Sequence, residues 1–176
     1  MTKISTGSFD LNAWLNGGYE KDIITMIAGP PGSGKTNFSI LASCSQSKNN
    51  KKVIFIDTEG GFSVDRVKQI VGENHEKILE NIFLLKPTNF EEQKQCFEKL
   101  LIAVKKEQIG LIVVDGMAML YRLELGDAVQ SKNDLDIKNI NREIANQMRV
   151  LAEISRKQEI PILITNQVYS GFVSEE

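Results

Sequence analysis

Five short apolar runs, rich in β-branched residues, constrain the fold of this chain more than any other feature. They cover residues 23–28, 53–57, 82–85, 111–115 and 160–165. Because most of them do not alternate with polar residues, they are typical of parallel strands covered on both faces. Segments with helical length and spacing separate them, over residues 35–45, 64–71, 90–106 and 133–158. The pattern predicts an α/β fold in which helices flank a mostly parallel sheet with right-handed crossovers.

Composition excludes several classes of protein. The chain has 176 residues, of which 41% are apolar and 25% charged, as in globular proteins, and no repeat or linker divides it, so we expect a single domain over residues 1–176. No apolar run approaches the roughly 20 residues that span a bilayer, and we expect no secretory signal at the start. We therefore expect a cytoplasmic protein without a membrane partner. Cys44 and Cys96 lack metal-binding spacing and are expected to be reduced and buried, and the single histidine, His75, disfavours Ser–His and Cys–His catalysis.

The segment between the first apolar run and the first helix matches the pattern G-x-x-x-x-G-K-[ST]. Its residues are Gly29, Pro30, Pro31, Gly32, Ser33, Gly34, Lys35 and Thr36, and Asn37 follows. In a strand–loop–helix context, the amides of such a loop converge on phosphates at a helix N-terminus. Lys35 is then expected to reach the β- and γ-phosphates, and the Thr36 hydroxyl to ligate Mg²⁺. The alternative is a glycine-rich turn with a chance lysine.

Polar residues follow three of the other apolar runs. Asp115 ends the run 111–115, as a Walker B aspartate that holds Mg²⁺ requires, although many strands end in aspartate. Asp57 and Glu59 end another run, where a carboxylate either polarises an attacking water or caps the next helix. Asn166 and Gln167 follow the last run, where an amide either senses a γ-phosphate or closes a turn. Open α/β sheets bind ligands at the rim that these strand ends share.

Taken together, these segments resemble the RecA/RadA recombinase superfamily of ATPases, and within it the archaeal RadB branch. The resemblance is carried by STGSFDLNAWLNGGYEKDIITMIAGPPGSGKTN, FIDTEGGFSVDR, LIVVDGMAMLYR and ILITNQV, which occur in family order and cover nearly the whole chain. It implies a RecA-like P-loop NTPase core that binds ATP and Mg²⁺, without the N-terminal helix-hairpin-helix domain of most recombinases. This chain departs from the family in stopping soon after Gln167, so we expect a core that is short at its C-terminus. It also implies that Glu59 activates water and that Gln167 couples the γ-phosphate to a DNA-binding loop. Arg66, otherwise a helix-surface charge, corresponds to the arginine that stacks on adenine.

DNA contact is implied by the resemblance but is weakly supported by charge. The chain has 21 basic and 23 acidic residues, a net charge of −2, so any contact must come from a local patch. The stretch 122–133 matches the first DNA-binding loop of the family, with Arg122 and Lys132 as candidate contacts, and the residues after Gln167 match the second. Acidic residues in the first loop oppose binding to phosphates. We therefore expect weak, salt-sensitive binding to single-stranded DNA.

The leading functional hypothesis is an ATP-binding, weakly hydrolysing repair and recombination protein that regulates the main recombinase. Its expected partners are DNA and a recombinase or other repair protein, and it allows for a homo-oligomer. The alternative is a signalling ATPase that resembles KaiC and acts through protein partners without DNA. A small-molecule P-loop kinase is disfavoured because such kinases need a basic lid, and no arginine-rich segment follows the third apolar run.

Overall fold

The computed structural model describes residues 2–169 and is built around two sheets. The strands are β1 (Lys3–Ile4), β2 (Tyr19–Glu20), β3 (Ile24–Gly29), β4 (Lys52–Asp57), β5 (Ile82–Leu85), β6 (Ile109–Asp115) and β7 (Ile162–Gln167). The helices are α1 (Phe9–Trp14), α2 (Lys35–Lys48), α3 (Val64–Val71), α4 (His75–Leu79), α5 (Phe90–Lys106), α6 (Met119–Gln130) and α7 (Asp134–Gln158), with a 3₁₀ turn at Gly72–Asn74.

The five longer strands form one parallel sheet in the order β3-β7-β6-β4-β5, and β1 and β2 form a small antiparallel pair. The last described strand, β7, lies between β3 and β6, which leaves β3 and β5 as the two edges. All five strands run in the same direction, so the carboxyl ends of β3, β4, β6 and β7 meet on one rim. The predicted α/β fold with a mostly parallel sheet is confirmed.

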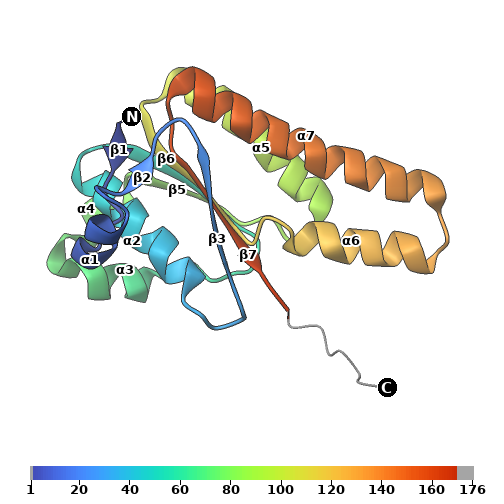
Figure 1. Ribbon diagram of the computed structural model, residues 1–176, viewed down its shortest axis with the longest axis horizontal. Coiled ribbons are helices and arrows are strands. Elements are labelled where there is room, and N and C mark those ends of the chain that lie inside the picture. The colour runs from blue at the N-terminus through green and yellow to red at the C-terminus, as the bar shows by residue number, and fades with distance from the viewer. Residues whose placement is uncertain (1, 170–176) are drawn as a thin grey trace.

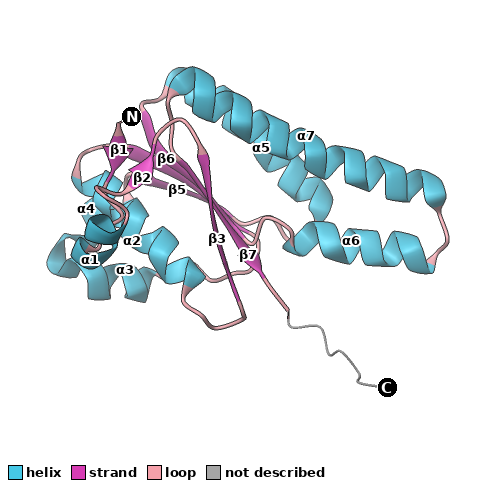
Figure 2. Cartoon of the chain, viewed as in Figure 1, coloured by secondary structure: helices cyan, strands magenta, loops and turns pink. Residues whose placement is uncertain are grey.

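Helices cover both faces of this sheet (Figures 1 and 2). One layer contains α1, α2, α3 and α4, and the other contains α5 and α7, with α6 extending beyond the sheet. Successive residues of the buried strands point to opposite layers, because side chains alternate along a strand. Val113 packs in the core cluster that includes residues of α2, whereas Ile112 and Val114 pack with residues of α5 and α7. Apolar residues are thus needed at successive positions of the central strands β4, β6 and β7, which explains their continuous runs.

A helix occupies most of the stretch predicted as the first DNA-binding loop. The stretch 122–133, expected as a loop, lies mostly in helix α6, and only 131–133 form a turn before α7. The loop expectation was therefore wrong. The residues assigned to a second DNA-binding loop lie largely outside the described residues.

Within residues 2–169, no helix is long and apolar enough to cross a bilayer. Cys44 and Cys96 are both buried and free, as expected.

Candidate functional site

The glycine-rich loop joins β3 to α2, and Gly34 is the N-cap residue of that helix with φ +85°. Gly32 also has a positive φ of +73°, a conformation that L side chains rarely adopt. Lys35 begins the helix and is only 7% exposed. Its Nζ donates to the carbonyl oxygens of Gly29 (3.1 Å) and Pro30 (2.9 Å). The lysine therefore folds back over its own loop, with its charge beside the helix N-terminus.

Asp115, at the end of β6, is held by two hydroxyl groups. The Thr36 hydroxyl donates to Oδ2 at 2.7 Å, and the Thr165 hydroxyl donates to Oδ1 at 2.6 Å. Burial raises the pKa of Asp115, the two hydroxyl donors lower it by a smaller amount, and the nearby carboxylates of Asp57 and Glu59 raise it further. The carboxylate is thus placed where an ionised group is costly unless a cation accompanies it. Thr165 was not among the expected site residues, and its only sequence signal is a hydroxyl inside an apolar run.

The two acidic residues at the end of β4 have different surroundings. Asp57 is 1% exposed, and its two carboxylate oxygens accept hydrogen bonds from the amides of Gly61 and Phe62, both at 3.0 Å. The side chain that caps α3 belongs to Ser63. Asp57 therefore organises the turn between β4 and α3, and neither acidic residue caps the helix. Glu59 is half-buried at the rim of the sheet, and the amides of Gly61 and Phe62 bind Asp57 and not Glu59.

Glu59 contacts Gln167 across the rim. The Gln167 amide Nε2 donates to Glu59 Oε2 at 2.9 Å. Gly116 lies beneath this contact with φ +84°, and a Cβ there would come within 2.5 Å of Thr58 Oγ1 and 2.6 Å of Glu59 Cγ. Only glycine combines this backbone conformation with so close an approach. Gly116 was missed by sequence reasoning, because a glycine after a strand is also common in ordinary turns.

These donors fit a nucleotide phosphate chain with Mg²⁺. The loop offers backbone amides at a helix N-terminus and a buried lysine, as bound phosphates require. Thr36 and Asp115 offer one hydroxyl and one carboxylate oxygen in direct contact. Among residues 2–169 no group of three or more His, Cys, Asp or Glu side chains could hold a metal ion by itself. Mg²⁺ in nucleotide sites characteristically takes few protein ligands and completes its shell with phosphate oxygens and water.

The remaining nucleotide-site candidates, Asn37 and Arg66, are both exposed. Asn37 is exposed in the first turn of α2. Arg66 is exposed on α3, where its guanidinium donates to Gln69 Oε1 at 2.8 Å. The expected roles of both residues in binding the nucleotide stay predictions.

The two candidate DNA contacts lie at opposite ends of α6. Arg122 lies in the first turn and donates to the Gln167 carbonyl oxygen and to Asn166 Oδ1, at 3.3–3.4 Å. Lys132 lies in the turn before α7 with φ +53°. Eight helical steps separate Arg122 from Gln130, the last residue of α6, and at about 1.5 Å of rise per residue they span about 12 Å, so Arg122 and Lys132 do not form one compact patch.

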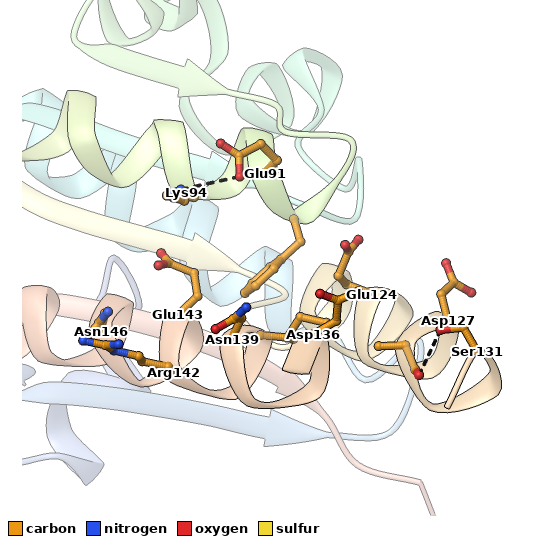
Figure 3. Close-up of a pocket in the computed structure, with 13 residues that line it drawn as sticks. Glu91, Lys94, Glu124, Asp127, Ser131, Asp136, Asn139, Arg142, Glu143 and Asn146 are labelled. Atoms are coloured by element: carbon orange, nitrogen blue, oxygen red, sulfur yellow. Dashed lines mark hydrogen bonds and ion pairs between the residues drawn. The ribbon is translucent and has the colours of Figure 1, made fainter. Parts of the chain in front are cut away.

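An acidic cleft of about 780 Å³ lies between α5, α6 and α7, and Ser131, the residue before Lys132, lines it (Figure 3). Its acidic lining residues are Glu91, Glu124, Asp127, Asp136 and Glu143. Two basic residues, Lys94 and Arg142, also line it, and Lys94 pairs with Glu91 at 3.6 Å. This excess of carboxylates opposes the approach of a nucleic-acid backbone to the far end of α6.

Comparison with known proteins identifies the family. The sequence profile of the Rad51 family matches residues 1–175. The chain belongs to the Rad51 family. Its Rad51-family relatives include proteins named DNA repair and recombination protein RadB. One, from Methanococcus maripaludis, is 46% identical over 158 residues, covering 90% of this chain and 70% of the relative. The protein from Methanobrevibacter smithii is 39% identical over 172 residues, covering 97% of this chain and 69% of the relative. The protein from Methanocaldococcus jannaschii is 42% identical over 154 residues, covering 88% of this chain and 69% of the relative. The resemblance inferred from sequence is thereby confirmed.

Proposed function

We propose that this chain binds Mg²⁺ and ATP at the rim of the sheet, hydrolyses ATP slowly, and acts in DNA repair and homologous recombination. The observation that carries the proposal is the convergence of four polar side chains beside the glycine-rich loop. Thr36 contacts Asp115, and Glu59 contacts Gln167, although each pair is distant in sequence. The role in repair and recombination is supported by the Rad51 family and by the names of the relatives.

Each residue of the site has a role that its surroundings support. When bound, ATP supplies the bond that is cleaved, and Mg²⁺ helps to neutralise the charge that develops there. Lys35 would exchange its bonds to the loop carbonyls for the phosphates, and Thr36 and Asp115 would hold the metal. Glu59 would accept the proton of the attacking water, and the Gln167 amide would orient the Glu59 carboxylate. Slow turnover is proposed from the resemblance to the RadB branch.

We place the chain in recombination as a regulator of the main recombinase, with weak contact to single-stranded DNA. The near-neutral charge and the acidic cleft support contact through protein more than through nucleic acid. The same observation favours the second candidate, a KaiC-like ATPase that acts through protein partners alone. Binding to single-stranded DNA at two salt concentrations separates the two candidates, because salt-sensitive DNA binding supports only the first.

Calorimetry with Mg·ATP tests the nucleotide site. Lys35→Ala should lower the affinity at least tenfold, or about 1.4 kcal/mol, because the buried cation facing the phosphates is lost. Lys48→Ala is the matched control, since Lys48 ends the same helix and is exposed. Equal affinity in folded Lys35→Ala and wild-type proteins contradicts the site.

Cross-linking to the recombinase of the same cell, with and without ATP, tests the regulatory role. The absence of an ATP-dependent complex would contradict that role.

A further inference from the structure

The basic residue at the start of α6 is engaged with the nucleotide rim. Two guanidinium nitrogens of Arg122 donate to the Gln167 carbonyl oxygen, each at 3.3 Å, and one also donates to Asn166 Oδ1 at 3.4 Å. Its guanidinium carbon lies 5.6 Å from the centre of the Tyr169 ring, within the range of a cation–π contact. Arg122 therefore contacts three residues at or just after the end of β7. The resemblance alone would have assigned Arg122 to DNA binding.

A continuous chain of contacts leads from Arg122 to Glu59. The Tyr169 hydroxyl donates to Gln167 Oε1 at 2.9 Å, which leaves Gln167 Nε2 to donate to Glu59 at 2.9 Å. Because a hydroxyl donor occupies the amide oxygen, the amide is held in the orientation that points its NH₂ group at the carboxylate. Arg122 fixes both ends of this arrangement, since it holds the Gln167 backbone and stacks on the ring that carries the hydroxyl.

We propose that Arg122 is a positioning residue for ATP hydrolysis: through Tyr169 and the backbone of Gln167, it holds the Gln167 amide against Glu59. This inference rests on the proposed function, because it concerns the orientation of the proposed base. It also ties the start of α6 to the nucleotide site, so a partner that displaces α6 would change the orientation of Glu59. Arg122 does not reach the phosphate loop in the described structure, and nucleotide binding itself should not depend on it.

The test separates binding from the chemical step. Arg122→Ala should bind Mg·ADP within twofold of wild type. Its kcat should fall about tenfold. Tetrafluoroaluminate mimics the transferring phosphoryl group and should raise the ADP affinity of wild type, and Arg122→Ala should lose most of this increase. Tyr169→Phe removes only the hydroxyl and should lower kcat severalfold, less than additively with Arg122→Ala. Arg142→Ala is the matched control, because it removes an exposed arginine from α7, away from the rim.

The outcomes for the two proposals are distinguishable. A wild-type protein that neither turns over ATP nor gains ADP affinity with tetrafluoroaluminate contradicts the proposed hydrolysis. If wild type shows both properties and Arg122→Ala retains them, the inference about Arg122 is overturned while the proposed function stands. A loss of the same size in Arg142→Ala, or a loss of ADP affinity in Arg122→Ala, also overturns it. Arg122→Lys keeps the charge but not the two-nitrogen contact and should recover only part of kcat.

Discussion

The Gln167 side chain donates a 2.9 Å hydrogen bond to Glu59, a residue 108 positions earlier in the chain. The two residues follow or end strands that are not neighbours, because β6 lies between β4 and β7. The contact therefore passes over the end of β6, where Gly116 leaves room for it. A carboxylate that is already oriented in the protein needs less rearrangement when it acts as a base.

Replacing Glu59 should separate turnover from binding. Glu59→Gln retains the shape and an oxygen that can accept from Gln167, but it cannot take a proton at neutral pH. Since a general base contributes about 10²–10⁴-fold, kcat should fall at least tenfold while calorimetric ATP affinity stays unchanged. Full turnover in Glu59→Gln would assign proton transfer to another group.

Asp115→Asn should raise stability and weaken metal-dependent binding. The pKa of Asp115 is raised by burial, so its ionised form destabilises the metal-free fold at neutral pH. A neutral amide removes this cost, and the melting temperature of the metal-free protein should rise, by about 2–4 °C for each kcal/mol gained. Calorimetry should show that Mg²⁺ no longer strengthens ATP binding. A lower melting temperature would mean that the hydrogen bonds from Thr36 and Thr165 outweigh the burial of charge.

Gly116→Ala should be the most costly of three glycine substitutions. Gly116 and Gly72 both have positive φ, but only at Gly116 would a Cβ meet other atoms. Gly72 has φ +67° and ψ −136°, a backbone region that favours glycine, so Gly72→Ala should cost about 1–3 kcal/mol of backbone strain. Gly116→Ala should cost about 1–3 kcal/mol more than that for displaced neighbours. Gly126 lies inside α6 in open space, so Gly126→Ala should stabilise by about 0.5–1 kcal/mol. Urea unfolding measures the change in free energy of unfolding for all three substitutions. Equal costs at Gly116 and Gly72 would show that the Glu59 and Thr58 side chains move away from the new Cβ without a measurable penalty.

Any binding of single-stranded DNA through α6 should have a shallow salt dependence. With Arg122 and Lys132 as the only contacts, log affinity against log salt should have a slope no steeper than about −1.4, from about −0.7 per contact. Arg122→Ala/Lys132→Ala should abolish this dependence in fluorescence anisotropy titrations. A steeper slope, or identical isotherms for both proteins, would place the DNA contact on another surface.

The cysteines should react slowly in the folded protein. Burial raises the pKa of Cys44 to about 11 and also raises that of Cys96. Against a free thiol pKa of about 8.5, the reactive thiolate of Cys44 near pH 8 is reduced by about a hundredfold or more. Its reaction with an aromatic disulfide in Cys96→Ser should therefore keep rising with pH up to about 11. A plateau near 8.5, as in the urea-unfolded chain, would show that the thiol is accessible.

The sheet and much of the rim could be predicted from sequence, because buried parallel strands require uninterrupted apolar residues. The predicted runs 82–85 and 111–115 lie within β5 and β6, and Asp115 ends its strand as expected. Helix α6 was missed because Gly126 interrupts it and its apolar residues form no clear stripe. The resemblance to the recombinase family also assigned residues 122–133 to a DNA-binding loop and not to a helix.

The pairing of side chains across the rim could not be predicted, because it depends on strand order. Asp57 and Glu59 are chemically alike in sequence, and only the turn geometry shows that Asp57 is occupied by backbone amides. Likewise, Thr165 reaches Asp115 only because β7 lies beside β6. A tyrosine and an arginine at Tyr169 and Arg122 have no sequence pattern that would link them.

The position of β7 has a consequence for synthesis of the protein. It is the last strand of the described chain to leave the ribosome, yet it occupies the sheet between β3 and β6. Until it emerges, β3 has no neighbour in the sheet, and Asp115 and Glu59 lack Thr165 and Gln167. Contacts so distant in sequence form late in folding. A nascent chain can therefore display the complete glycine-rich loop while the site around it is still unfinished.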